Sequence, residues 1–315
     1  MSAPLAVLVI GAGAVGGFYG ALLARVGHRV SVVVRSDFAA VRRDGLQLRS
    51  PLGALSFRPA DVFADVAAAA AAGRYDLVMI TTKATADPAA LIAPLLPGEA
   101  TFLLLQNGLD VEQPLTRRYP ELTLLSALAF ICTSRVAPGV IEHQAYGAIT
   151  LGAWPPGSQA GEAMAARLAA DWQAAGVPAE HSADIAAARW RKCLWNAPFN
   201  PLSVIAGAST AELLAVPEIE ALVRRAMGEV REVAQAAGIE LPAAAIEQNL
   251  HNTRQMPPYR TSMLLDYEAG RPLEREAILG SVLRRAQAAD VAVPTLQALD
   301  ALLALRERQR AGGAA

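Results

Sequence analysis

The chain has 315 residues, of which 53% are hydrophobic, and a formal net charge of −1. This length is sufficient for about two domains with ample buried core. The net charge is near zero, and the sequence contains no block of like charges. It therefore lacks the basic composition that is typical of proteins that bind nucleic acid or an anionic membrane. The two cysteines provide no disulfide framework, which is typical of the reducing cytoplasm, where we expect the protein to be located.

Residues 1–24 carry no charged side chain, as would also be true of a signal peptide or a membrane span. However, no lysine or arginine precedes this apolar run, and five glycines between positions 11 and 20 interrupt it. No other stretch is long and apolar enough to span a bilayer. We therefore expect a folded segment here, and no membrane partner.

The first half of the chain alternates between short apolar runs and helical patterns. The expected strands are Leu5–Ile10, Arg29–Val34, Asp76–Thr82, Thr101–Leu105, Leu124–Phe130, Val140–His143, Ile149–Leu151 and Val177–His181. The expected helices are Val15–Val26, Asp65–Ala72, Pro88–Leu96 and Gln159–Ala175. This alternation predicts a Rossmann-type, doubly wound parallel sheet in an α/β protein.

The second half contains amphipathic helical runs and no further strand pattern. These runs are Ala183–Asn196, Ile219–Ala237, Glu274–Ala289 and Thr295–Arg308. We therefore expect a boundary near residues 182–186, with an N-terminal nucleotide-binding domain at 1–183 and an all-α domain at 184–315. The tail, Ala311–Ala315, is expected to fray.

A glycine-rich turn follows the first expected strand and precedes the first expected helix. Its residues are Gly11, Ala12, Gly13, Ala14, Val15 and Gly16, which fit the pattern G-x-G-x-x-G. The first glycine permits the tight turn, the second lets the backbone approach a pyrophosphate, and the third lets helix and strand pack closely. The alternative is a glycine-rich turn without a ligand. The strand–turn–helix context favours a dinucleotide site.

The second expected strand is followed by Arg35. Relatives of this fold that bind NAD carry an acidic residue about there, which bonds the ribose 2′-hydroxyl. An arginine cannot accept that bond, but it can pair with a 2′-phosphate. The sequence therefore predicts NADP as the cofactor, with a solvated arginine at a strand end as the alternative.

Two polar side chains follow other expected strands. Lys83 comes after Asp76–Thr82, and Asn107 comes shortly after Thr101–Leu105. In open α/β sheets, ligands bind just outside the carboxyl ends of the strands. Lys83 could therefore meet a phosphate or carboxylate, and Asn107 could hold nicotinamide or substrate oxygens. For each residue the alternative is a polar strand terminus without a ligand.

In the second half, Lys192 is followed by asparagines at i+4 and i+8, Asn196 and Asn200. On a helix these three side chains share one face. A protonated lysine can donate the proton that ketone reduction requires, and the amides suit a ligand with several oxygens. Pro198 should kink or end the helix, which makes the alignment of Asn200 less secure than that of Asn196.

Two arginines, Arg189 and Arg191, flank this lysine, and we expect both to project differently from it. An alternative interpretation of the segment is a solvent-facing basic cluster with Trp190 and Trp195 as core anchors. A second candidate set contains Ser262 and Glu274 on either side of an expected turn. Glu274 would open a helix, where a carboxylate is also favourable without any function.

At this point the pattern resembles the ketopantoate reductase (2-dehydropantoate 2-reductase) family over nearly the full length of the chain. The matching pieces are Gly11–Gly16, Arg35, Thr82-Lys83-Ala84, Gln106-Asn107-Gly108, Lys192 with Asn196 and Asn200-Pro201-Leu202-Ser203, Ser262-Met263 with Asp266, Glu274, and Gly280. The resemblance implies a Rossmann domain followed by a helical domain like that of 6-phosphogluconate dehydrogenase. It also implies NADPH-dependent reduction of 2-dehydropantoate to (R)-pantoate in pantothenate (vitamin B5) biosynthesis.

The family's pattern implies a role for each matching residue. Lys192 would donate the proton, and Glu274 would contact the cofactor and help to place Lys192. The implied substrate-binding residues are Asn107, Lys192, Asn196, Asn200, Thr210 and Ser262. The implied cofactor-binding residues outside the glycine turn are Arg35, Lys83, Asn107, Ser134 and Glu274. Position 210 departs from the family, because asparagine is common there and this chain has threonine.

Two other functions remain open. The chain could be an NADP-dependent reductase of another 2-oxo acid, or a non-catalytic NADP-binding protein. A metal mechanism is not expected, because the four histidines are scattered without cysteine or carboxylate at ligand spacing. The expected partner is a small 2-oxo acid rather than nucleic acid, and the apolar helices would permit a homodimer.

Overall fold

The computed structural model describes residues 3–96 and 98–312. The chain divides into two compact units. The first contains the chain up to Gln106 together with Val111–Ile185, and the second contains Asn107–Asp110 together with the chain from Ala186 onward. The expected boundary at 183/184 lies two residues before the division at 185/186. We did not anticipate that a short segment near residue 107 belongs to the second unit. Its meaning as a division between cofactor and substrate domains remains a prediction.

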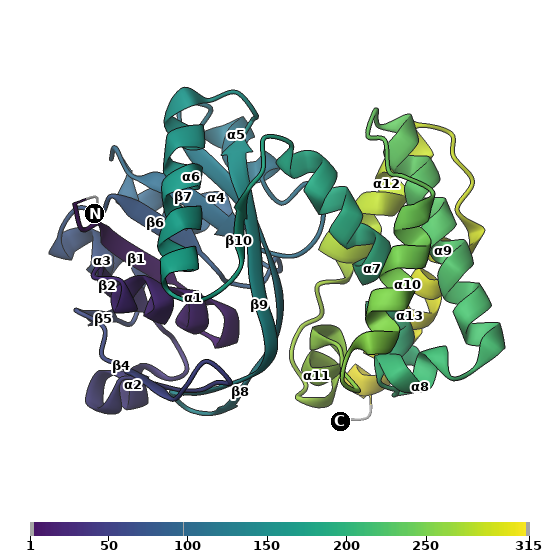
Figure 1. The fold of residues 1–315 in the computed structure, drawn as a ribbon, viewed down its shortest axis with the longest axis horizontal. Coiled ribbons are helices and arrows are strands. Elements are labelled where there is room, and N and C mark those ends of the chain that lie inside the picture. The colour runs from purple at the N-terminus through teal and green to yellow at the C-terminus, as the bar shows by residue number, and fades with distance from the viewer. Residues whose placement is uncertain (1–2, 97, 313–315) are drawn as a thin grey trace. The chain divides into compact units, whose positions relative to one another are not determined.

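The first unit is built on one large sheet (Figure 1). Its strands are β1 (Ala6–Ile10), β2 (Arg29–Val33), β3 (Leu46–Arg49), β4 (Leu55–Phe57), β5 (Val62–Phe63), β6 (Leu77–Ile80), β7 (Thr101–Leu105), β8 (Leu124–Ala137), β9 (Val140–Trp154) and β10 (Ala179–His181). The order is β4-β3-β9-β8-β7-β6-β1-β2-β5, with β10 paired to β9. Along the run β5-β2-β1-β6-β7-β8, each strand is parallel to the next, which confirms the α/β class with a parallel-rich sheet.

The helices of this unit are α1 (Ala14–Arg25), α2 (Phe38–Asp44), α3 (Val66–Ala72), α4 (Pro88–Ile92), α5 (Gln113–Arg118) and α6 (Gln159–Ala174), with a 3₁₀ turn at Ala93–Leu95. The side chains of Asp65, Asp87 and Ser158 cap α3, α4 and α6 by accepting bonds from backbone N–H groups. Helices α1 and α6 pack together against β8 and β9, and Figure 1 shows α6 in front of the strands.

Two features of this half differ from the sequence-based expectation. The separate strands expected at Val140–His143 and Ile149–Leu151 are wrong, because both belong to β9, which pairs antiparallel with β8. Positive φ angles at Tyr146 (66°) and Gly147 (114°) break the alternating pattern inside β9 and coincide with a register shift. The short elements α2, α5, β3, β4 and β5 were not predicted.

The described residues of the second unit form helices and connecting loops, with no β-strand among them. Its helices are α7 (Ile185–Ala206, which begins at the last residue of the first unit), α8 (Thr210–Leu214), α9 (Pro217–Ala236), α10 (Ala244–Gln255), α11 (Ser262–Glu268), α12 (Ser281–Ala288) and α13 (Pro294–Gly312), with a π-helical turn at Glu276–Gly280. The expected fraying of Ala311–Ala315 is wrong for the first two residues, which continue α13, and 313–315 lie outside the described residues.

Of the two outcomes expected at Pro198, a kink or an end of the helix, the end is wrong, because α7 continues through it to Ala206. Pro198 cannot donate the backbone bond to the carbonyl of Leu194. Its neighbours Leu194 and Phe199 are both completely buried, so packing holds this turn in the helix despite the missing bond. The uninterrupted helix keeps the residues on either side of the proline at regular helical spacing.

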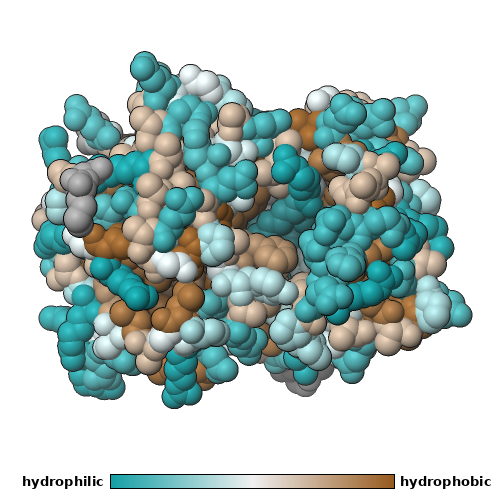
Figure 2. All heavy atoms as spheres, in the orientation of Figure 1, coloured by the Kyte–Doolittle hydropathy of each residue, from teal (hydrophilic) through white to brown (hydrophobic). Residues whose placement is uncertain are grey.

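Each unit has its own apolar core. On the face drawn in Figure 2, hydrophilic and hydrophobic residues are interspersed, which is ordinary for a folded surface. Within residues 3–96 and 98–312, no helix has the length and apolarity needed to cross a membrane.

Candidate functional site

The glycine turn joins β1 to α1 in the first unit. Gly11 has φ +90°, and a side chain there would lie 2.8 Å from Cγ2 of Thr82. A side chain on Gly16 would overlap the hydroxyl of Thr81, which is itself bonded to the carbonyls of Ile10 (3.0 Å) and Gly11 (2.9 Å). Both positions therefore require glycine for the fold itself.

Gly13 differs from its neighbours in this turn. An added Cβ would meet only the Gly11 carbonyl, at 3.8 Å, so the fold does not require glycine here. Gly13 precedes α1, whose first turn has no side-chain cap and no acidic residue. Uncapped N–H groups at a helix N-terminus attract anions. These features fit a pyrophosphate approaching the turn closely at Gly13.

The expected 2′-phosphate residue, Arg35, lies just beyond β2 and is exposed. Beside it in the chain, Asp37 is buried, bonds the N–H of Gly139 (3.0 Å) and forms an ion pair with Arg135. Arg135 also donates to the hydroxyl of Ser36 (2.9 Å). The Asp37 carboxylate is thus neutralised by Arg135, and the corner beside Arg35 carries net positive charge. Arg135 was not predicted from the sequence, because it lies 98 positions from Asp37 in the chain.

The remaining candidates of the first unit lie on different elements. Lys83 follows β6 and is partly buried. The side chain of Gln106, after β7, donates to the carbonyl of Thr82 (2.7 Å), which ties the ends of these two strands together. Ser134 lies in β8 opposite Glu142. These positions are compatible with the expected cofactor roles, which remain predictions.

Three side chains of the second unit form a polar cluster: Lys192 on α7, Asn107 and Glu274. The amino group of Lys192 donates to Oδ1 of Asn107 at 2.8 Å. The amide nitrogen of Asn107 in turn donates to Oε2 of Glu274 over a longer distance of 3.5 Å. Glu274 accepts the first backbone bond of the following helix, from Ile278, so its position is fixed by that helix start. The chain thus brings together residues that are 85 and 167 positions apart.

The pKa of Lys192 is lowered to about 7, from an ordinary value of 10.5, and burial is the largest cause. The positive charge of Arg189 contributes to this lowering, whereas the carboxylate of Glu274 opposes it. A lysine that titrates near neutrality can both hold a proton and release it, as a general acid must. This cluster can therefore deliver a proton to a nearby oxygen.

The structure places Arg189 differently from the sequence-based expectation. We expected it to project differently from Lys192, but it lies three residues earlier on α7 and its charge acts on the lysine. Arg189 is buried, and its guanidinium donates to the carbonyl of Gly108 (3.0 Å). The i−3 spacing was the available signal for this proximity. Arg191 is exposed, as expected of a flanking residue.

The other candidates of the second unit are mostly buried. Asn196 and Asn200 follow Lys192 on α7 and are 6% and 2% exposed. Among the described residues, Oδ1 of Asn200 and the hydroxyl of Thr210 are buried and have no hydrogen-bond partner. Buried polar atoms are normally bonded, so two such atoms are consistent with a polar ligand. Ser262 begins α11 and is partly exposed.

No group of three or more histidine, cysteine, aspartate or glutamate residues suited to a metal ion occurs in the part of the chain that the structure describes. Both cysteines, Cys132 and Cys193, are buried and unpaired.

The chain matches two family models, described as "Ketopantoate reductase PanE/ApbA" (residues 7–156) and "Ketopantoate reductase PanE/ApbA C terminal" (residues 184–307). It is 37% identical over 295 residues to a 2-dehydropantoate 2-reductase from Nostoc sp., which covers 92% of each chain. It is also similar to the crystal structure of 2-dehydropantoate 2-reductase from Methylococcus capsulatus, with 42% identity, a TM-score of 0.87 and coverage of 96% and 97% of the two chains. D-mandelate dehydrogenase with NADH and anilino(oxo)acetate has a TM-score of 0.86 over 96% of this chain and 99% of its own, and at 22% identity it shows the fold alone.

Proposed function

Because the chain belongs to the ketopantoate reductase family, a family of pyridine-nucleotide-dependent oxidoreductases, we propose that it reduces 2-dehydropantoate to (R)-pantoate with NADPH. The observation that carries the proposal is the cluster of Lys192, Asn107 and Glu274. It supplies a half-buried lysine with a pKa of about 7, held by an amide and balanced by a carboxylate. The reaction would belong to pantothenate biosynthesis, and we expect it to take place in the cytoplasm.

Lys192 donates the proton in this proposal. Reduction of the keto group places negative charge on its oxygen, and a protonated amine within hydrogen-bond reach stabilises that charge and then transfers the proton. Asn107 accepts one N–H of the ammonium, and this hydrogen bond helps to orient the amine. Glu274 favours the protonated state of Lys192, because its negative charge raises the pKa of the amine.

The nicotinamide cofactor supplies the hydride when it is bound. The residues that would hold it are those of the glycine turn, Gly11 to Gly16, together with Arg35 at the 2′-phosphate. Lys83, Ser134, Asn107 and Glu274 are proposed as further contacts. Support for this assignment comes from the tight packing at Gly11 and Gly16, the open space at Gly13 and the uncapped N-terminus of α1.

The substrate would be held by the amides and hydroxyls of the second unit. These residues are Asn107, Asn196, Asn200, Thr210 and Ser262, together with Lys192. The buried atoms of Asn200 and Thr210 that lack partners in the described chain support this proposal. Threonine at position 210 offers one hydroxyl where an amide is common in the family.

The test is an assay of NADPH and NADH oxidation with a panel of 2-oxo acids. The panel contains 2-dehydropantoate, its analogue without the hydroxyl (3,3-dimethyl-2-oxobutanoate), and a linear 2-oxo acid such as 2-oxopentanoate. We expect the highest kcat/KM for 2-dehydropantoate with NADPH. A higher kcat/KM for another acid would show that the chain is a reductase of a different substrate. Absence of turnover with every acid, despite nucleotide binding, would favour a non-catalytic binding protein.

A further inference from the structure

The segment from Asn107 to Asp110, called here the 107–110 segment, leaves the sheet unit and is built into the helical unit. Leu109 is 4% exposed and belongs to the apolar core of the second unit. Its N–H donates to the carbonyl of Ala277 (3.0 Å), and its own carbonyl accepts a bond from the hydroxyl of Ser281 (3.1 Å). The segment is therefore held by both its backbone and its one large apolar side chain.

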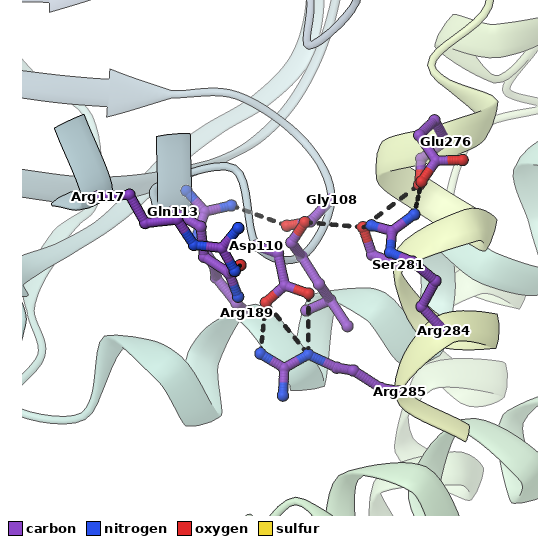
Figure 3. Close-up of polar contacts among 10 residues, drawn as sticks. Gly108, Asp110, Gln113, Arg117, Arg189, Glu276, Ser281, Arg284 and Arg285 are labelled. Atoms are coloured by element: carbon purple, nitrogen blue, oxygen red, sulfur yellow. Dashed lines mark hydrogen bonds and ion pairs between the residues drawn. The ribbon is translucent and has the colours of Figure 1, made fainter. Parts of the chain in front are cut away.

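Two arginines bond the residues on either side of Leu109, as Figure 3 shows. Arg189 on α7 donates to the carbonyl of Gly108 (3.0 Å). Arg285 on α12 forms a two-pronged ion pair with Asp110, in which its Nε lies 3.0 and 3.1 Å from the two carboxylate oxygens. Paired contacts of this kind between guanidinium and carboxylate are geometrically specific. Arg285 also lies over the ring of Trp190, with its Cζ 5.8 Å from the ring centroid, which fixes its direction.

The backbone of the segment is held in conformations that side chains disfavour. Gly108 has φ +102°, and a side chain there would overlap the carbonyl of Ala277. Asp110 has φ +63°, which is uncommon for a residue other than glycine or asparagine. Such conformations persist only where the surroundings impose them. The bonds to α7, α12 and the π-helical turn supply that restraint.

We propose that Arg189 and Asp110 are positioning residues, which hold the 107–110 segment on the helical unit and so keep the amide of Asn107 in hydrogen-bond reach of Lys192. All the contacts involved lie within the second unit, so the geometry of the proton-donating cluster is set inside that unit. The catalytic consequence rests on the proposed function, whereas the anchoring of the segment does not.

Arg189 has a second effect that Asp110 lacks. The charged groups that act on Lys192 are Arg189 from α7 and Glu274 from the start of the π-helical turn, and the neutral amide of Asn107 completes its surroundings. Loss of the Arg189 charge should raise the pKa of Lys192, because a positive neighbour disfavours the protonated amine. Loss of the Asp110 charge should leave this pKa unchanged. The two residues can therefore be told apart by pH dependence.

Hydrogen exchange of the protein without added nucleotide tests the anchoring. We expect Arg189→Met and Asp110→Asn to speed exchange of the Leu109 amide at least tenfold, because the first removes the bond to the Gly108 carbonyl and the second removes the charge and one acceptor oxygen of the two-pronged ion pair. Asparagine tolerates the positive φ of Asp110, so the second variant should fold even where the first is impaired. The matched control is Arg191→Met, an exposed arginine two residues along α7, which should leave exchange unchanged. Wild-type exchange in both test variants, or equally fast exchange in the control, would overturn the proposal.

Reductase kinetics test the consequence for catalysis. Misplacement of Asn107 should lower kcat roughly tenfold in Arg189→Met and Asp110→Asn, less than the loss of Lys192 itself. The pH at which kcat falls should rise in Arg189→Met, return to the wild-type value in Arg189→Lys and stay unchanged in Asp110→Asn. Fast exchange combined with wild-type kcat would refute the positioning role. A wild-type protein without reductase activity would refute the proposed function and leave the exchange result standing.

Discussion

The two units build their functional features in opposite ways. In the sheet unit, the glycine turn consists of six consecutive residues, and its close packing and open backbone depend on the lack of a side chain at its glycines. In the helical unit, the proton-donating cluster consists of Asn107, Lys192 and Glu274, and its properties come from charges that burial modifies. A local, backbone-based site depends on steric fit, whereas a site assembled from distant side chains depends on electrostatics and positioning. Substitutions in the glycine turn should therefore change folding stability and nucleotide affinity, whereas substitutions in the cluster should change the rate of hydride transfer and its pH dependence.

The largest effect is expected for Lys192→Ala. The single-turnover rate of hydride transfer should fall roughly 10²–10⁴-fold, because the general acid is lost. The dissociation constant for NADPH should change little if nucleotide affinity comes mainly from the glycine turn. Arg191→Ala is the control and should retain the wild-type rate. Equal rates in Lys192→Ala and the wild type would remove Lys192 from the proposed role.

Two glycine variants test the glycine turn of the sheet unit. Gly16→Ala introduces a methyl group that overlaps Thr81, and overpacking of this kind costs roughly 1–3 kcal/mol of folding free energy. Gly13→Ala has ordinary packing space, so its melting temperature should match that of the wild type. Gly13→Ala should weaken NADPH binding roughly tenfold or more, because its methyl group disturbs the approach of the pyrophosphate, whereas Gly16→Ala should act mainly through the packing of the turn. Calorimetry and nucleotide titration measure these two quantities, and undiminished affinity in Gly13→Ala would argue against a bound pyrophosphate at this turn.

Cofactor preference should respond to Arg35→Asp. A hydrogen bond to a charged group contributes about 1.5–3 kcal/mol, so NADPH affinity should fall roughly 10–100-fold while NADH affinity is little changed. Arg42→Asp on α2 is the matched control, since it alters the charge of the same region. Titration of both nucleotides provides the comparison. A parallel loss for NADPH and NADH, or a similar loss in the control, would contradict the assignment of Arg35 to the 2′-phosphate.

The smallest effect concerns stability. The folded-state pKa of Lys192, about 7, lies below its ordinary value of 10.5, so between these values the unfolded chain binds more protons. Raising the pH through this window should therefore stabilise the fold, by at most about 1.4 kcal/mol per pH unit from this residue. Lys192→Met should lack that contribution. Urea unfolding of both proteins at pH 7.5 and 9.5 measures the difference, and identical pH slopes would show that the lysine is not strongly desolvated.

The sequence predicted the local features well. The glycine turn, most strands of the sheet and the helical spacing of Lys192 and Asn196 are visible in short windows, because each depends on neighbouring residues. The continuation of α7 through Pro198 was not predictable in this way, since tertiary burial outweighs the local penalty there. The division of β9 into two expected strands failed because a bulge interrupts its alternating pattern.

Contacts between distant segments were the main omission. The membership of Asn107 in the helical unit, the bond from Arg189 to Gly108 and the pairing of Arg135 with Asp37 join residues far apart in the chain. No local pattern encodes such contacts. The exception is the proximity of Arg189 to Lys192, which their i, i+3 spacing on one helix could have indicated.

The most direct test of proton donation by Lys192 is the pH dependence of single-turnover hydride transfer from NADPH to 2-dehydropantoate in the wild type and in Lys192→Ala. We expect the wild-type rate to fall as the pH rises above about 7, where Lys192 loses its proton, and the slow residual rate of the variant to show no such fall. A decline at the same pH in both proteins would mean that another group gives the proton, and would contradict this role of Lys192.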